Sequence, residues 1–336
     1  MRAAVFQGAG RIAPGDWPRP AIGAGELLLR VRGCGLCGSD IAKIAAPDTR
    51  GPAVFGHEVV GDVTEVGEGV AGFAVGDRVV AAHHVPCGTC HYCRRGSESM
   101  CRAFKESNLD PGGFAEFVRV PAANVRAATF RVPDHLTDEE ASFVEPLACC
   151  ARAVERAAVS PGDTAVVVGL GSIGCLFVQL LRRAGATVVG CDPLVGRAKL
   201  AWALGAQISG PADVAADGAR SLSEGRGADH VVITGGGADV LPWAASVARD
   251  GGTLQFFAGG PGDRLPLPLS TLYHRELTIT TTYSSSASAL GRAFWLLAAG
   301  KVEVDRLITH RLPLERLAEG VELMRTREAM KVYVTP

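Results

Sequence analysis

The sequence has almost no net charge and no long apolar run, and both absences exclude classes of partner. Its 34 basic and 35 acidic residues give a net charge of −1, which provides no electrostatic basis for binding nucleic acid or an anionic membrane. No uncharged apolar run reaches the roughly 18 residues of a membrane-spanning helix. The N-terminus also lacks the basic and apolar regions of a secretory signal. We therefore expect a soluble, cytoplasmic protein.

The order of sequence patterns predicts two domains of different character. The chain has 336 residues, which is long for a single core. Residues 1–130 are rich in glycine and proline around short β-branched runs, typical of a small irregular β-domain. From residue 164 onward, apolar strand patterns alternate with helical ones, which is typical of a doubly wound parallel sheet. The expected strands are 164–168, 187–191, 230–234, 253–258 and 277–282, and the expected helices are 176–184, 196–204, 241–248 and 287–299.

A glycine loop follows the first of these strands. Gly169, Gly171 and Gly174 form the pattern GxGxxG between an apolar strand and a helix, which is the context that a dinucleotide-binding loop requires. In such a loop the first glycine permits the turn, the second lets a pyrophosphate approach, and the third packs helix against strand. We expect Ser172 and Ile173 of the same loop to contact the cofactor. A structural glycine turn with a solvated acid is the alternative.

Asp192 ends the next strand, 18 residues after Gly174. A carboxylate there accepts hydrogen bonds from the ribose hydroxyls and repels a 2′-phosphate, which favours NAD over NADP. Arg197 is expected beside the adenine. Three further residues are expected at the cofactor: Ala258, Gly259 and Tyr283.

Ten cysteines are many for a cytoplasmic protein, and four of them lie close together as Cys87, Cys90, Cys93 and Cys101. Four thiolates on one short loop can surround a zinc ion tetrahedrally and leave no open position, so such a site is structural. An iron–sulfur cluster or disulfides are the alternatives for this spacing.

Two further segments contain metal-ligand types. Cys37 is followed by Ser39 and Asp40, and Gly56-His57-Glu58 begins the pattern GHE-x2-G-x5-G-x2-V, which ends at Val70. Together with the four-cysteine loop and the glycine loop, these segments resemble the zinc-dependent medium-chain dehydrogenases along essentially the whole chain. Glu145-Pro-Leu-Ala is most similar to the sorbitol (polyol) dehydrogenase branch.

The resemblance implies a fold, a metal site and a reaction. The fold would be α/β, with a GroES-like β-barrel catalytic domain (1–148 and 286–336) around a Rossmann NAD-binding domain (149–285). A catalytic zinc would bind Cys37, His57 and Glu145, with Glu58 beside them or directly bound. Asp40 would orient His57, and Ser39 would accept the alcohol proton. With the structural site, this implies two zinc ions per subunit and NAD-linked oxidation of a secondary alcohol of a polyol, sugar or cyclitol.

The chain departs from its relatives at several positions. The histidine that relays the proton in many relatives is replaced by Ala42, and an arginine of sorbitol dehydrogenases is replaced by Ser284. Lys43 is either a surface residue or a substrate contact, and it is also a candidate replacement for the missing proton relay. We also expect a polar substrate pocket, to which Lys105, Glu106 and Asn108 would contribute. We expect His83, His84 and His91 to be surface residues.

Other activities remain open. L-threonine, a cyclitol or a simple secondary alcohol would suit the same architecture, and a non-catalytic nucleotide-sensing relative or a zinc-lacking reductase is a different class. The expected partner is a small-molecule alcohol, with neither nucleic acid nor membrane. Family resemblance implies a homodimer or homotetramer, with 277–282 as an edge strand that pairs between subunits.

Overall fold

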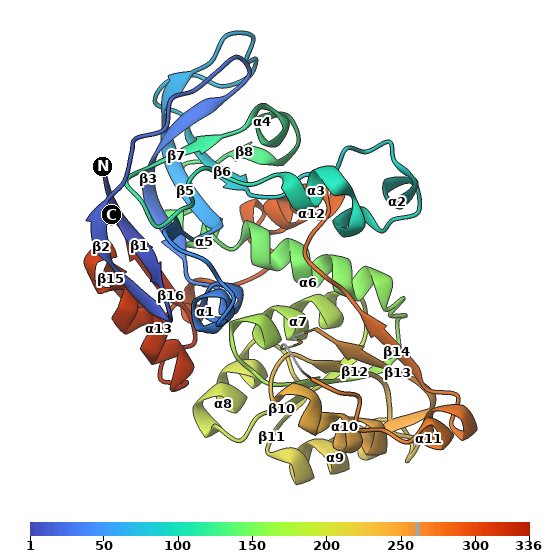
Figure 1. Ribbon diagram of the computed structural model, residues 1–336. Coiled ribbons are helices and arrows are strands. Elements are labelled where there is room, and N and C mark those ends of the chain that lie inside the picture. The colour runs from blue at the N-terminus through green and yellow to red at the C-terminus, as the bar shows by residue number, and fades with distance from the viewer. Residues whose placement is uncertain (258, 260–262) are drawn as a thin grey trace. The chain divides into compact units, whose positions relative to one another are not determined.

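The computed structural model describes residues 1–257, 259 and 263–336 (Figure 1). The chain divides into two compact units. Unit 1 comprises Met1–Ala148 and Ser285–Pro336, and unit 2 comprises Cys149–Ser284. No helix within the described ranges is both long enough and apolar enough to cross a bilayer.

Unit 1 is built on two β-sheets. The larger has seven strands, ordered β15-β16-β3-β5-β6-β8 with β7 paired to β3, and the smaller has the order β2-β1-β4. The strands are β1 (Arg2–Gly8), β2 (Arg11–Asp16), β3 (Leu27–Gly35), β4 (Ala53–Val54), β5 (Glu58–Val66), β6 (Arg78–Ala82), β7 (Phe117–Val120), β8 (Thr129–Arg131), β15 (His310–Pro313) and β16 (Val332–Thr335).

Short helices connect these strands. They are α1 (Gly38–Ala45), α2 (His91–Arg94), α3 (Arg102–Glu106), α4 (Ala122–Ala128), α5 (Asp138–Ala141), α12 (Ala287–Ala298) and α13 (Leu317–Arg325). Helix α6 (Val144–Arg156) leads the chain from unit 1 into unit 2. Thr137 caps α5: its hydroxyl oxygen accepts a hydrogen bond from the Glu140 N–H, and the Glu140 carboxylate accepts one from the Thr137 N–H. The helix there ends after one turn, and α6 begins separately at Val144.

Unit 2 is the doubly wound sheet that the alternating pattern predicts. Six parallel strands have the order β11-β10-β9-β12-β13-β14. They are β9 (Thr164–Val168), β10 (Thr187–Cys191), β11 (Ile208–Gly210), β12 (Ala228–Ile233), β13 (Ala248–Phe256) and β14 (Thr278–Thr281), joined through α7 (Ser172–Arg183), α8 (Val195–Ala203), α9 (Ala212–Ser221), α10 (Leu241–Val247) and α11 (Leu269–His274) (Figure 1).

Strand β9 lies inside this sheet, with strands on both sides of it. Every residue of β9 is buried, as expected for a strand with both faces covered. Its side chains join an apolar core with strands β10 and β12, including Val166, Val189 and Val231. Strand β14 is the last in the strand order. Its outer edge pairs with no other strand within the described part of unit 2.

Candidate metal centre and cofactor site

Three candidate ligands of unit 1 lie together. Ligand atoms of Cys37, His57 and Glu58 are all within 4.8 Å of one another. Sheet pairing produces this arrangement, because β3 and β5 are antiparallel and Gly35 lies opposite Glu58. Cys37 follows the end of β3 and is the N-cap residue of α1. The ends of two adjacent strands thus bring the ligands to one place.

Asp40 contacts two of the candidate ligands, Cys37 and His57. It is fully buried, its Oδ2 accepts the Cys37 N–H at 3.2 Å, and its Oδ1 lies 3.2 Å from Nδ1 of His57. Burial opposes ionisation of Asp40, but His57, together with Lys43 and the Cys37 N–H, outweighs it and holds the pKa of Asp40 below its usual value. Burial likewise opposes protonation of His57, whereas Asp40 keeps the pKa of His57 well above its usual value. A carboxylate behind a ligating imidazole orients the ring.

Lys331 is a residue of this site that sequence reasoning missed. Its ammonium group pairs with Oε2 of Glu58, and both side chains are almost completely buried. Burial alone would lower the pKa of Lys331, but Glu58 outweighs it and the pKa is raised. The two side chains meet above Gly35, where a Cβ atom would overlap Oε2 of Glu58. Only glycine at position 35 therefore leaves room for this pair.

The donor set fits zinc. A thiolate, an imidazole and a carboxylate are all zinc ligands, and three protein ligands leave a fourth position for water or substrate. Oε1 of Glu58 is buried and has no hydrogen-bond partner in the described residues. A buried carboxylate oxygen without a partner is costly, and a cation bound there would satisfy it.

Glu145, the other glutamate expected at the catalytic zinc, also belongs to unit 1. Glu145 lies buried in the first turn of α6. It is not in the group of ligand atoms that lie within 4.8 Å of one another among the described residues. In this conformation Glu58 is therefore the carboxylate that accompanies Cys37 and His57.

The other predicted residues of this region are more exposed. Ser39 and Lys43 are exposed in α1, and so is Ala42. The ammonium group of Lys43 lies 6.0 Å from the ring centroid of Phe55. Lys105 and Glu106 are exposed on α3, where Glu106 pairs with Arg102.

The prediction that His83 is a surface residue is wrong. His83 is only 8% exposed, and its ring centroid lies 4.6 Å from that of His57 and 3.9 Å from that of His84. His84 is half-buried, its ring is tilted by 41° against that of Phe104, and its Nδ1 lies 2.5 Å from the Ser107 carbonyl oxygen. Burial first, and the positive groups around it second, hold the pKa of His83 well below its usual value. His91 is exposed, as expected.

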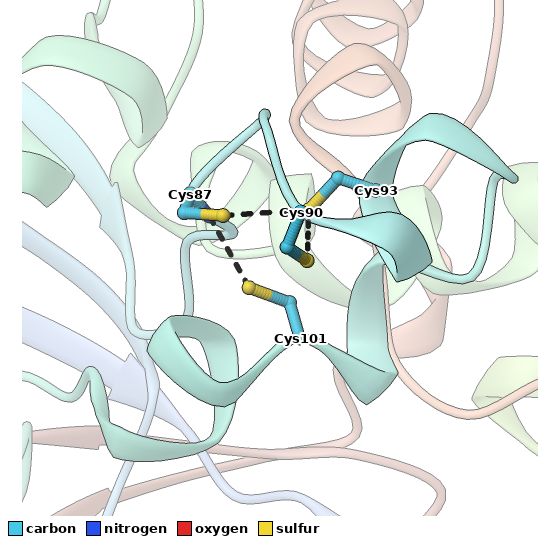
Figure 2. A group of neighbouring side chains, drawn as sticks. All are labelled: Cys87, Cys90, Cys93 and Cys101. Atoms are coloured by element: carbon cyan, nitrogen blue, oxygen red, sulfur yellow. Dashed lines mark hydrogen bonds between the residues drawn. The ribbon is translucent and has the colours of Figure 1, made fainter.

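The four cysteines of the loop 87–101 form a second group of ligands. Their sulfur atoms lie within 4.8 Å of one another and point toward a common centre (Figure 2). The Sγ atoms of Cys90 and Cys93 are 3.5 Å apart, and those of Cys87 and Cys93 are 4.0 Å apart. Four thiolates at about 2.3 Å from zinc would be about 3.8 Å from one another.

Cys87 is the thiol of this loop that ionises most readily. Hydrogen bonds from the backbone and side chain of Thr89 are the main reason why the pKa of Cys87 falls to about 6. All ten cysteines belong to the described residues and are free thiols, so the disulfide alternative has no support. The distances fit zinc, which requires thiolate ligands.

In unit 2 the glycine loop joins β9 to α7. Gly169 has a φ of +85°, a conformation that glycine adopts without strain. A Cβ on Gly174 would overlap the Gly169 carbonyl, whereas a Cβ on Gly171 would meet only Arg197 Nη1, at 3.9 Å. Gly174 thus serves helix packing, and Gly171 leaves open space. Ser172 and Ile173 form the first turn of α7, where unpaired N–H groups favour a pyrophosphate.

Asp192 lies at the end of β10, 5% exposed. Its carboxylate accepts the N–H groups of Leu170 and Leu194, each at 2.8 Å. A carboxylate has about four acceptor positions, so both ribose hydroxyls can still bind. A pocket of about 340 Å³ adjoins Asp192, and its lining includes Pro193, Val195, Ala198, Lys199, Trp202 and Pro211.

The remaining cofactor predictions have different outcomes. Arg197 lies beside Gly171 of the glycine loop and does not line the pocket next to Asp192. Trp202, which sequence reasoning missed, is 65% exposed in that pocket and offers an aromatic face. Gly259 and Tyr283 are exposed, and Ala258 lies outside the described residues. Ser284, at a φ of +61°, and Tyr283 each accept a hydrogen bond from Arg152 through the carbonyl oxygen.

A dinucleotide-type sheet in one unit, with two groups of zinc-type ligands in the other, defines a zinc-dependent dehydrogenase. Comparison with known proteins agrees. Residues 23–134 match the family described as "Alcohol dehydrogenase GroES-like domain", and residues 172–298 match "Zinc-binding dehydrogenase".

Relatives with related names cover nearly the whole chain. The chain is 32% identical to D-altritol 5-dehydrogenase of Agrobacterium fabrum, over 94% of each chain. It is 29% identical to L-galactonate-5-dehydrogenase of Escherichia coli, over 94% of this chain and 93% of the relative. The structure of alcohol dehydrogenase TADH from Thermus sp. ATN1 superposes with a TM-score of 0.86 at 31% identity, over 100% and 99% of the two chains. The chain therefore belongs to the zinc-dependent alcohol dehydrogenases of the medium-chain dehydrogenase/reductase superfamily.

Proposed function

We propose that this protein is an NAD-linked dehydrogenase that oxidises a secondary alcohol of a polyol, sugar or cyclitol to the ketone, reversibly. The observation that carries the proposal is the grouping of Cys37, His57 and Glu58 within 4.8 Å, with Asp40 buried behind His57. The names of the relatives, a polyol dehydrogenase and a sugar-acid dehydrogenase, support this substrate class.

The residues of unit 1 would act on the substrate alcohol. Zinc, when bound, supplies a Lewis acid that lowers the pKa of an alcohol ligand. Cys37 and His57 would hold it with a glutamate, either Glu58 or Glu145. Ser39 follows Cys37 by two residues and is exposed. Its hydroxyl group would accept the proton of the alcohol and release its own proton to solvent, so that Ser39 stays neutral. Asp40 would keep the imidazole of His57 in one orientation, and Lys331 would do the same for Glu58.

The residues of unit 2 would bind the cofactor, which accepts hydride when bound. The open space at Gly171 and the N-terminus of α7 would take the pyrophosphate, with Arg197 beside it. Asp192 would bind the ribose hydroxyls and repel a 2′-phosphate, so we propose NAD rather than NADP. Gly259 and Tyr283, together with Ala258, complete the proposed set.

We also propose a structural zinc at the four cysteines of the loop 87–101, which gives two zinc ions per subunit. The exposed edge of β14 supports a homodimer or homotetramer in which this strand pairs between subunits. Ten free thiols fit a reducing compartment and support a cytoplasmic location.

A substrate panel tests the proposal. Polyols, cyclitols, sugar acids, L-threonine and simple secondary alcohols would be assayed with NAD and with NADP by absorbance of the reduced cofactor. We expect NAD reduction with at least one polyhydroxylated substrate, and its loss after chelation of the catalytic zinc. Turnover of L-threonine alone would favour the alternative dehydrogenase. No turnover of any alcohol by zinc-loaded protein would contradict the proposal and favour a nucleotide-sensing role.

A further inference from the structure

Four aromatic rings of unit 1 lie in a row that begins at a candidate ligand of the catalytic metal. The ring centroid of His83 is 4.6 Å from that of His57 and 3.9 Å from that of His84. The ring of Phe104 follows, 4.9 Å from that of His84. These four residues, His57, His83, His84 and Phe104, are called the ring row below. The proposed reaction uses only the first of them.

The far end of the ring row is joined to the four-cysteine loop. Phe104 lies in α3, and Cys101 is the N-cap residue of that helix. The Lys105 N–H donates a hydrogen bond to the Cys101 carbonyl oxygen at 3.2 Å, and the Phe104 side chain is 1% exposed. A metal ion bound by the four thiols would fix Cys101. It would therefore also fix the start of α3 and the position of the Phe104 ring.

Hydrogen bonds hold the middle of the ring row in place. Asn124 is fully buried and donates through Nδ2 to the His83 carbonyl oxygen at 2.9 Å. Ser107 is the C-cap residue of α3. Its hydroxyl oxygen accepts the Val85 N–H at 2.9 Å, and its carbonyl oxygen lies 2.5 Å from Nδ1 of His84. Helix α3 thus contacts His84 through a ring in its middle and through the backbone at its end.

The near end of the ring row restricts the imidazole of His57. Asp40 lies 3.2 Å from Nδ1 of His57, which leaves Nε2 of the ring for a metal ion. A contact at one edge still allows the ring to tilt, whereas a second ring packed beside it opposes the tilt. The side chains of His57 and His83 are both more than nine-tenths buried. In a close-packed interior, neither ring can move without displacing the other.

We propose that the ring row couples the two metal sites. With the four-cysteine loop filled, Phe104, His84 and His83 hold the His57 ring in the orientation that binds the catalytic metal. With the loop empty, α3 is released, the His57 ring tilts, and the catalytic site binds its metal more weakly. Packed side chains carry coupling of this kind when they have two arrangements, here those of the filled and the empty loop. The inference rests on the proposed function, from which it takes both metal sites.

Binding of Co²⁺ to the catalytic site tests the role of the rings. The full-length protein keeps its structural zinc, verified by metal analysis, and the dissociation constant and visible absorption spectrum of bound Co²⁺ are measured. His84→Ala should weaken binding about tenfold or more, the effect of removing a group that orients a ligand, and should change the spectrum. His84→Phe retains a ring and should bind Co²⁺ nearly as the wild type does. The matched control is His91→Ala, which removes an exposed histidine of the same loop and should leave both readouts unchanged.

A double-mutant cycle tests the coupling itself. Cys93→Ser empties the four-cysteine loop and should weaken Co²⁺ binding at the catalytic site about tenfold. In the His84→Ala background the same change should have a much smaller effect, because the ring row is already interrupted. Phe104→Leu provides the same test without loss of a metal ligand, and circular dichroism shows whether each variant is folded. Phe104→Leu should weaken Co²⁺ binding although all four cysteines are present.

Three results would overturn the inference. The first is equal Co²⁺ affinity and an equal spectrum in the wild type, His84→Ala and Phe104→Leu. The second is a set of affinity losses from Cys93→Ser and His84→Ala that simply multiply in the double variant. The third is a loss in His84→Phe as large as that in His84→Ala, because the ring would then have no role. Each leaves the proposed dehydrogenase in place, whereas failure of the proposed function would be wild-type protein that binds both metal ions and oxidises no alcohol.

Discussion

Replacing Lys331 with methionine should destabilise unit 1 by removing one partner of a buried ion pair. The Lys331 side chain is 4% exposed and that of Glu58 is fully buried. Methionine nearly preserves the length of the side chain, so the change removes charge with little change in packing. In protein freed of the catalytic metal, Glu58 would be left as a buried carboxylate without its cation.

The magnitude follows from the burial of both groups. Loss of one partner from a buried pair costs about 3–5 kcal/mol, because the remaining charge is uncompensated. Glu58→Gln should cost a similar amount, since it leaves Lys331 unpaired. The double variant removes both charges, so its loss should be clearly smaller than the sum of the two single losses.

Urea unfolding, followed by circular dichroism, measures these differences. All variants would be compared with Lys301→Met, which should unfold like the wild type. Metal analysis of the same samples should show that Lys331→Met retains the structural zinc, because the four cysteines lie on a separate loop. Unchanged unfolding of Lys331→Met, or strictly additive losses in the double variant, would refute the reasoning.

The remaining predictions concern the two metal centres and the cofactor. Cys37→Ala should abolish turnover and leave unfolding by urea unchanged; activity near that of the wild type would disprove the ligand assignment. Cys93→Ser should lower the thermal midpoint and the zinc content, because a structural zinc contributes to folding; it fails if both stay constant. Gly35→Ala should displace Glu58 and Lys331 and lower occupancy of the catalytic zinc, measured by metal analysis, while NAD affinity stays constant. Asp192→Ala should weaken NAD binding by about 1.5–3 kcal/mol and narrow the preference over NADP; a wild-type protein that prefers NADP would contradict it.

Features that depend on short segments could be predicted from the sequence. The four cysteines and the glycine loop each lie within 15 residues or fewer along the chain, so their spacing alone determines what they can form. The same holds for strand β9, whose apolar run and following glycine loop are adjacent in the sequence. The helix α7 begins at Ser172, directly after the glycine loop, and not at residue 176, because polar and small residues of its first turn obscure the apolar period.

Features that depend on pairing between distant strands could not be predicted. Lys331 reaches Glu58 only because β16 pairs with β3 beside β5, and no local pattern around Lys331 indicates an ion pair. Gly35 would have been a clue, since a glycine at a strand end can mark a close approach of side chains.

His83 shows the limit of local composition. Two adjacent histidines after a strand, near a polar loop, are typical of a surface. The structure instead packs His83 against His57 and His84, because β6 runs antiparallel to β5 and brings its end to the start of β5. The register that gathers the ligands thus also buries His83.

Zinc content measured together with activity tests the central claim most directly. The account predicts about two zinc ions per chain, one for each group of ligands, in protein purified without added chelator. Controlled chelation should remove one zinc and abolish alcohol-dependent NAD reduction while the protein stays folded, and added zinc should restore both. Protein with one zinc or none that still reduces NAD with an alcohol at full rate would contradict the account.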